Sequence, residues 1–194
     1  MRIETERLIL RKPKKEDWKS IFEACQLKNF SKQTKRIPHP FMKKDAKIFL
    51  KKALKKWKNK EYAFFIELKS ERKVIGIIYL EDIRLFSKTA ETISWINPKY
   101  QRKGYVLEAK IAVNDFAFNE LGLRKILSYI FSENKASIEV QKKMGYSFEG
   151  RMIKNCKAVS TGRIHDVDIY GLFRTDWKKI SPKLKKEMNK KLTS

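Results

Sequence analysis

Apolar and polar residues recur along the chain with two different periods. Apolar residues at every second position predict strands, and apolar residues three or four positions apart predict helices. The clearest helical stripe lies in residues 43–58, where lysines fill the positions between the apolar residues. The pattern predicts strands over residues 7–12, 62–68, 73–80, 91–96, 125–131, 146–152 and 167–173, and helices over residues 14–28, 43–58, 104–121 and 134–144.

The order of these elements predicts the fold class. A run of strands followed by alternating helices and strands indicates an α/β (α+β) fold, with a mixed, mostly antiparallel central sheet of about seven strands and helices on both faces. The sequence shows no internal repeat and no long linker, so we expect a single domain over residues 1–178. Residues 179–194 are rich in lysine and are expected to form a basic C-terminal tail.

Composition adds a strong positive charge. The 194 residues include 46 Lys and Arg against 22 Asp and Glu, a formal net charge of +24. Such an excess attracts nucleic acid or acidic proteins. Lysines scattered over a solvated surface, as in a lysine-biased genome, produce the same excess. The sequence leaves both interpretations open, so nucleic-acid binding through a basic surface stays an alternative.

The apolar runs and the cysteines indicate the compartment. The longest apolar run, residues 74–80, is far shorter than the roughly 20 residues of a spanning helix, and residues 1–10 lack the apolar core of a signal peptide. The two cysteines show no CxxC spacing, which argues against a structural metal site. We therefore expect a cytoplasmic protein that holds no metal and does not associate with membranes.

The segment from Trp95 to Ala109 carries the clearest chemical signal. A predicted strand ends near Ile96, a short turn follows, and a helix begins at Gly104. Backbone N–H groups without partners at such a helix start form an anion site, and a glycine there lets the backbone approach a phosphate. Arg102 and Lys103 add positive charge. Taken alone, the same pattern is also typical of an ordinary turn before a helix.

The same segment resembles a known family. Gln101-x-x-Gly104-x-Val106 is similar to the Q/R-x-x-G-x-G/A signature of the GNAT N-acetyltransferases. Residues 4–11, 90–98, 134–150 and 166–177 resemble, in the same order, motifs of the RimJ/RimL branch of that family. The resemblance covers residues 3–178. It implies the GNAT fold and a site for acetyl-CoA formed by Trp95, Ile96, Gln101, Arg102, Lys103, Gly104, Tyr105, Val106, Asn134 and Ser137.

The resemblance also implies roles in acetyl transfer by direct attack of an amine. Backbone N–H groups near Trp95 and Ile96 would polarise the thioester carbonyl, and Ser137 would hydrogen-bond the leaving sulfur. Asn134 would hold the pantetheine arm of the coenzyme or order a water molecule. Glu91 is our candidate for the base, because a carboxylate on a central strand can be desolvated and its pKa raised.

Each of these residues also has a plainer interpretation. Ser137 fits a first helical turn, Asn134 fits an N-cap, and Glu91 fits a surface charge at a strand edge. His39, between two prolines, is a candidate base or acceptor contact, or else an exposed loop residue.

Three positions depart from the pattern of the family. Arg102 stands where glycine is common, and Val106 stands where glycine or alanine is usual. Gln141 stands where many other branches carry a tyrosine that acts as general acid, so that mechanism is not available at this position.

Two functions follow as hypotheses. The first is an N-acetyltransferase that uses acetyl-CoA and acts on a primary amine, with the N-terminal amine of an acidic or ribosomal protein as a candidate acceptor. The second is a degenerate GNAT-fold protein that has lost the coenzyme and binds RNA or acidic partners through its lysines. A monomer and a homodimer are both compatible with the resemblance.

Overall fold

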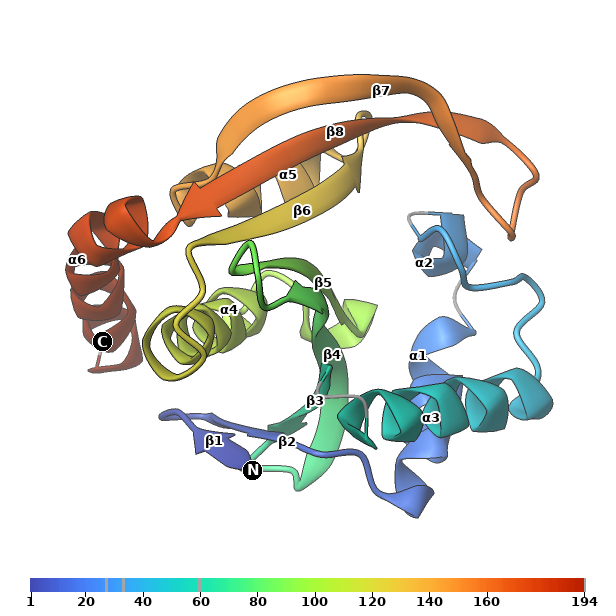
Figure 1. Ribbon diagram of the computed structural model, residues 1–194. Coiled ribbons are helices and arrows are strands. Elements are labelled where there is room, and N and C mark those ends of the chain that lie inside the picture. The colour runs from blue at the N-terminus through green and yellow to red at the C-terminus, as the bar shows by residue number, and fades with distance from the viewer. Residues whose placement is uncertain (27, 33, 59–60, 194) are drawn as a thin grey trace.

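The computed structural model describes residues 1–26, 28–32, 34–58 and 61–193. Within these residues, eight strands form one sheet in the order β1-β2-β3-β4-β5-β6-β8-β7 (Figure 1). Every neighbouring pair is antiparallel except β5 and β6, which are parallel. The strands are β1 (Arg2–Glu4), β2 (Leu8–Arg11), β3 (Tyr62–Leu68), β4 (Lys73–Arg84), β5 (Thr89–Ile96), β6 (Lys125–Phe131), β7 (Ser147–Lys157) and β8 (Ile164–Phe173).

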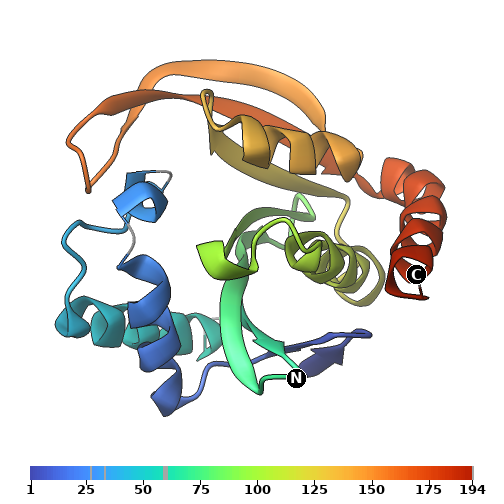
Figure 2. The ribbon, with the colours of Figure 1, turned by 180° about the vertical axis from the view of Figure 1, so that it is seen from behind.

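Helices cover both faces of this sheet. They are α1 (Trp18–Cys25), α2 (Lys28–Lys32), α3 (Lys43–Lys58), α4 (Tyr105–Asp115), α5 (Lys135–Lys143) and α6 (Arg174–Thr193), with short helical turns η1 (Lys15–Asp17), η2 (Pro98–Tyr100) and η3 (Phe116–Glu120). One apolar core lies between the sheet and α1 and α3, and a second lies between the sheet and α4 and α6. Seen from behind, α5 crosses in front of β6 and β8 (Figure 2).

The predicted fold class is confirmed, with one strand more than expected. The additional strand, β1, has three residues and is too short for its period to be recognised. The helix expected over residues 14–28 is divided: η1 and α1 take its first part, Lys28 begins α2, and residue 27 lies outside the described residues. Residue 178 lies inside α6, whose second half places Leu184 and Met188 in the core.

Strand β4 separates the two cores. Ile75 and Ile78 belong to the core beneath α4, whereas Ile77 and Tyr79 belong to the core beneath α1 and α3. This explains why residues 74–80 form an unbroken apolar run: a strand that is buried on both faces needs no polar positions. None of the helices that the structure describes has the length and apolar character needed to cross a membrane.

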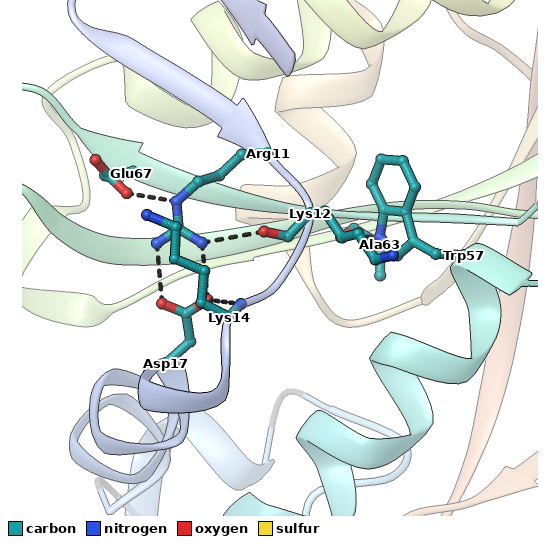
Figure 3. A network of polar contacts seen from close by, with 7 residues as sticks. All are labelled: Arg11, Lys12, Lys14, Asp17, Trp57, Ala63 and Glu67. Atoms are coloured by element: carbon teal, nitrogen blue, oxygen red, sulfur yellow. Dashed lines mark hydrogen bonds and ion pairs between the residues drawn. The ribbon is translucent and has the colours of Figure 1, made fainter. Parts of the chain in front are cut away.

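Arg11 fastens the start of α1 to the sheet (Figure 3). Its guanidinium binds both carboxylate oxygens of Asp17, at 2.8 and 2.9 Å, and also binds Glu67 on β3. In the same region, the indole Nε1 of Trp57 donates to the carbonyl of Ala63 at 3.0 Å and ties α3 to β3. These bonds fix the positions of α1 and α3 against the sheet.

Gly76 allows β4 and β5 to approach closely. A Cβ at this position would lie 2.4 Å from the Trp95 carbonyl oxygen and 2.6 Å from Cδ1 of Ile96. Beside it, the register between β3 and β4 shifts, because Ile66 pairs with Gly76 and Glu67 pairs with Val74. Gly76 therefore marks both a register shift and a close approach between neighbouring strands.

We predict that Gly76→Ala destabilises the protein by about 2 kcal/mol, because the added methyl group meets a backbone oxygen that moves only if the end of β5 moves. Urea denaturation followed by circular dichroism measures this loss. An unchanged unfolding midpoint would contradict the account of this contact.

Candidate active site

Strands β5 and β6 part after a short stretch of pairing. They pair only at Thr89–Lys125, Ala90–Ile126 and Glu91–Leu127. Beyond this point β5 remains paired with β4 as far as Ile96, and β6 remains paired with β8 as far as Phe131. The two strands therefore diverge, and a cavity of about 1370 Å³ is lined by residues from both of them.

The turn before α4 lies at this cavity. Arg102 has φ = 61° and Gly104 has φ = 80°, both in the left-handed region. Among the described residues, no protein acceptor meets the backbone N–H groups of residues 102–107. These donors and the helix dipole favour an anion such as a pyrophosphate. The turn also explains why glycine suits position 102, since a left-handed conformation strains residues with a side chain.

A buried carboxylate connects this turn to the N-terminal strands. Glu108, in the first turn of α4, is 5% exposed and accepts hydrogen bonds from the Thr5 hydroxyl at 2.6 Å and the Arg7 backbone N–H at 2.9 Å. The Arg7 guanidinium binds the other carboxylate oxygen at 2.7 Å and donates to the Lys103 carbonyl at 3.1 Å. The guanidinium also lies over the ring of Tyr105, 4.4 Å from its centre. The turn is thus preformed.

The structure brings most of the expected site residues together. The cavity lining includes Glu91, Trp95, Ile96, Gln101, Arg102, Lys103, Gly104, Tyr105, Val106, Asn134 and Ser137. Val106 also packs against the core beneath α4. His39 is exposed in the loop after α2 and does not line the cavity, although its neighbour Pro38 does.

Two of these side chains make local hydrogen bonds. Asn134 caps α5, because its side-chain oxygen accepts from the Ser137 N–H at 3.1 Å. The Gln101 amide donates to the Ile96 carbonyl at 3.2 Å, so it connects the turn before α4 to the end of β5. The capping role expected of Asn134 is therefore present in the structure, and it leaves the Ser137 hydroxyl at the cavity.

Glu91 has an environment that suits a base. It lies directly opposite Glu81 in the β4–β5 ladder and is half-buried at the cavity. Burial, together with the negative charge and hydrogen bond of Asp82 and the charge of Glu81, raises the pKa of Glu91 above its usual range. Glu81 itself is buried and paired with Lys56 of α3 at 2.5 Å.

The opposite wall of the cavity is aromatic. The ring of Trp95 meets the edges of Phe30 and Phe49, with ring centres 5.2 and 6.5 Å apart. Basic residues outnumber acidic ones around the whole cavity. The basic residues are Arg7, Lys35, Arg36, Lys52, Lys56, Arg102, Lys103, Lys110 and Lys143, and the acidic residues are Asp45, Glu81 and Glu91.

Sequence reasoning missed several polar groups in the cavity. Thr92, Lys110 and Ser128 line it and are almost fully buried. A signal was present for Lys110, because it follows Val106 by four residues and precedes Val113 by three, on the apolar face of the predicted helix. Within the described part of the chain, no group of three His, Cys, Asp or Glu residues could hold a metal ion.

Comparisons with known proteins show sequence similarity to one family. A family model described as "Acetyltransferase (GNAT) domain" matches residues 7–147. The uncharacterized N-acetyltransferase YnaD of Bacillus subtilis strain 168 is 35% identical over 158 residues, which is 80% of this chain and 88% of YnaD.

Solved structures show the same fold. A GNAT-family acetyltransferase from Bacillus anthracis has a TM-score of 0.78 at 27% identity, covering 90% of this chain and 99% of the other. Spermidine N-acetyltransferase from Vibrio cholerae, in complex with CoA and spermine, has a TM-score of 0.76 at 22% identity, with coverages of 90% and 99%.

We predict that Glu108→Ala lowers the free energy of unfolding by about 3 kcal/mol, because Arg7 and Thr5 lose a buried carboxylate that satisfies them. Thermal or urea unfolding measures the loss. Glu139→Ala is the matched control: its pair with Lys142 is exposed, so the change should stay below about 0.5 kcal/mol. Equal effects of the two substitutions would contradict the role of Glu108.

Proposed function

The chain belongs to the acetyltransferase (GNAT) family, and we propose that it transfers an acetyl group from acetyl-CoA to a primary amine. The observation that carries the proposal is the parting of β5 and β6 beside the start of α4, where the backbone N–H groups meet no acceptor among the residues that the structure describes. Acetyl-CoA supplies an activated thioester and a pyrophosphate. This cavity offers a place for each: the N–H groups of residues 102–107 for the anion, and the opening between the strands for the thioester arm.

We assign the binding roles as the resemblance to the RimJ/RimL branch implies. Gln101, Arg102, Lys103, Gly104, Tyr105 and Val106 form the pyrophosphate turn. Asn134 and Ser137 face the thioester arm from α5. We assign the polarisation of the thioester carbonyl to the backbone near Trp95 and Ile96, where β6 leaves β5. Preformed donors of this kind stabilise the charge that develops on a carbonyl oxygen.

We propose direct attack by the acceptor amine, with Glu91 as the base. The amine must lose a proton to form the amide bond, and a carboxylate with a raised pKa accepts it more readily than an ordinary glutamate. Glu91 lines the cavity and lies on the same strand as Trp95 and Ile96, four and five residues before them. It receives the proton directly or through a water molecule.

The charge around the cavity supports an acceptor with negative groups near its amine. Basic side chains outnumber acidic ones, and Glu81 is already neutralised by Lys56. This distribution repels a polycation and attracts an acidic peptide. We therefore propose the N-terminal amine of an acidic protein as acceptor, unlike the spermine bound to the Vibrio cholerae neighbour.

This choice of acceptor predicts that an N-terminally free peptide with acidic residues after its first position is acetylated at least about tenfold more efficiently than spermidine, because its charge complements the cavity. Mass spectrometry with acetyl-CoA, comparing kcat/KM values, measures this. Gly104→Glu, which places a carboxylate in the turn, should remove both activities. More efficient acetylation of spermidine would overturn the proposed acceptor, and no acetylation of any amine would overturn the function.

The pH dependence of turnover tests Glu91. Because the pKa of Glu91 is raised, wild-type kcat/KM should fall on the acid side at a pH above the usual titration range of glutamate. Asp82→Asn removes a negative neighbour, so the pKa should fall and the acid limb should move to lower pH. Glu91→Gln should reduce kcat/KM by about 100-fold and abolish the limb. Glu139→Gln is the exposed control. An unchanged profile in Glu91→Gln would exclude Glu91 as the base.

A further inference from the structure

Four buried polar side chains from four elements line the cavity, and we call them the polar cluster. Thr92 of β5, Lys110 of α4, Ser128 of β6 and Gln141 of α5 are each 2–4% exposed, and all line the cavity. Thr92 and Ser128 directly follow Glu91 and Leu127, the last paired residues of the two strands. Thr92 and Ser128, together with Gln141, which bonds to Ser128, therefore lie where β5 and β6 begin to diverge, and we call this point the inner end of the cavity.

The hydrogen bonding of this cluster is incomplete. The Gln141 amide donates to the Ser128 hydroxyl at 2.7 Å, but its own oxygen and the Thr92 hydroxyl have no partner within the described residues. Buried polar groups without partners are costly, and in native structures they usually meet a ligand or water. The inner end of the cavity is thus built to receive a polar atom.

Lys110 is the charged member of this cluster. In the part of the chain that the structure describes, it makes no ion pair, and its ammonium lies 5.9 Å from the centre of the Tyr146 ring. Burial lowers the pKa of Lys110 to about 8. An unpaired buried ammonium is unfavourable in the free protein and becomes favourable beside an anion.

The acidic groups on α4 and the phenol of Tyr146 are either paired with other basic residues or uncharged, so they do not neutralise Lys110. On α4, Glu108 binds Arg7 and Asp115 binds Lys185 of α6. Burial raises the pKa of Tyr146, which keeps that phenol neutral. These groups leave the ammonium available to a ligand.

Three further charges complete the surroundings. Glu91 of β5 points to the opposite face of the sheet from Thr92, because neighbouring residues of a strand alternate. Lys143 of α5 lines the cavity and adds only positive charge, and Lys125 of β6 is paired with Glu149.

We propose that Lys110 is the acid that protonates the leaving sulfur in the acetyl transfer proposed above, on which this inference rests. As the carbon–nitrogen bond of the amide forms, the carbon–sulfur bond breaks and its electron pair stays on sulfur. A proton passes from the Lys110 ammonium to that sulfur, which yields the free thiol and a neutral amine. The proton lost by the acceptor goes to Glu91, and solvent restores both residues.

The other donors near α5 cannot perform this step. Ser137 and Gln141 lie one helical turn apart on α5 and both line the cavity, so they can hydrogen-bond a sulfur placed between them. A hydroxyl and an amide do not release a proton near neutral pH. An ammonium whose pKa is close to that of a thiol, about 8.5, transfers its proton at little cost in free energy.

Titration of the thiol of bound CoA tests the proposal without an acceptor. The ultraviolet absorbance of the thiolate, followed against pH, gives the pKa of CoA bound to the full chain. An ammonium beside the sulfur should lower this pKa by at least about one unit from the free value of about 8.5, a tenfold larger thiolate fraction near neutral pH. Lys110→Met should lose the shift, and Lys110→Arg should retain it. Lys142→Met, an exposed lysine of α5 outside the cavity lining, should behave like the wild type.

Calorimetric titration of CoA separates the two proposals. Binding to the wild type and to Lys110→Met, with a thiol pKa that differs between them, supports Lys110. Binding to both with the same thiol pKa overturns the role of Lys110 and leaves the acetyltransferase proposal intact. No binding of CoA to the wild type overturns both. Methionine fills a similar volume without charge, so Lys110→Met should fold; a cooperative thermal transition confirms this before titration.

Discussion

The divergence of β5 from β6 is the constraint on which the rest of the site depends. Each of the two strands is held by a different partner: β5 follows β4 to Ile96, and β6 follows β8 along its whole length. Gly76 permits this because any side chain there would meet the Trp95 carbonyl. Two strands that cannot continue to pair leave backbone groups and space between them, and the helices α4 and α5 border that space with polar atoms.

Ion pairs use many of the acidic residues, and the excess of lysine and arginine is left without acidic partners. Several buried or half-buried carboxylates serve structural ion pairs, including Asp17 and Glu67 with Arg11, Glu81 with Lys56, and Glu108 with Arg7. The surplus lysines lie largely on exposed positions, as on α3, which agrees with a solvated basic surface. The same surplus reaches the cavity, where it favours anionic groups such as those of the proposed coenzyme and acceptor.

Periodicity predicted the elements whose pattern is strong and missed those whose pattern is weak. The bounds of α3, β3 and β6 agree with the expected ranges because each has a regular apolar stripe or a compact apolar run. Strand β7 continues to Lys157, five residues past the expected end, and β8 begins at Ile164, three residues before the expected start. The pattern missed these residues because β7 is largely exposed and has little apolar signal. At the site, a local motif was enough to find the turn around Gly104. Lys110 was missed although its place on the apolar face of the predicted helix was a signal. The Glu81–Lys56 pair was missed because pairing over 25 residues of chain is a property of the tertiary structure.

Amide hydrogen exchange of the turn before α4, with and without acetyl-CoA, tests the central claim most directly. If the N–H groups of residues 102–107 bind the pyrophosphate, saturating acetyl-CoA should slow their exchange at least about tenfold, while the first turn of α6, a helix start outside the cavity lining, should exchange as before. Unchanged exchange at residues 102–107, or equal slowing at both helix starts, would contradict the claim that the diverging strands and this turn form the coenzyme site.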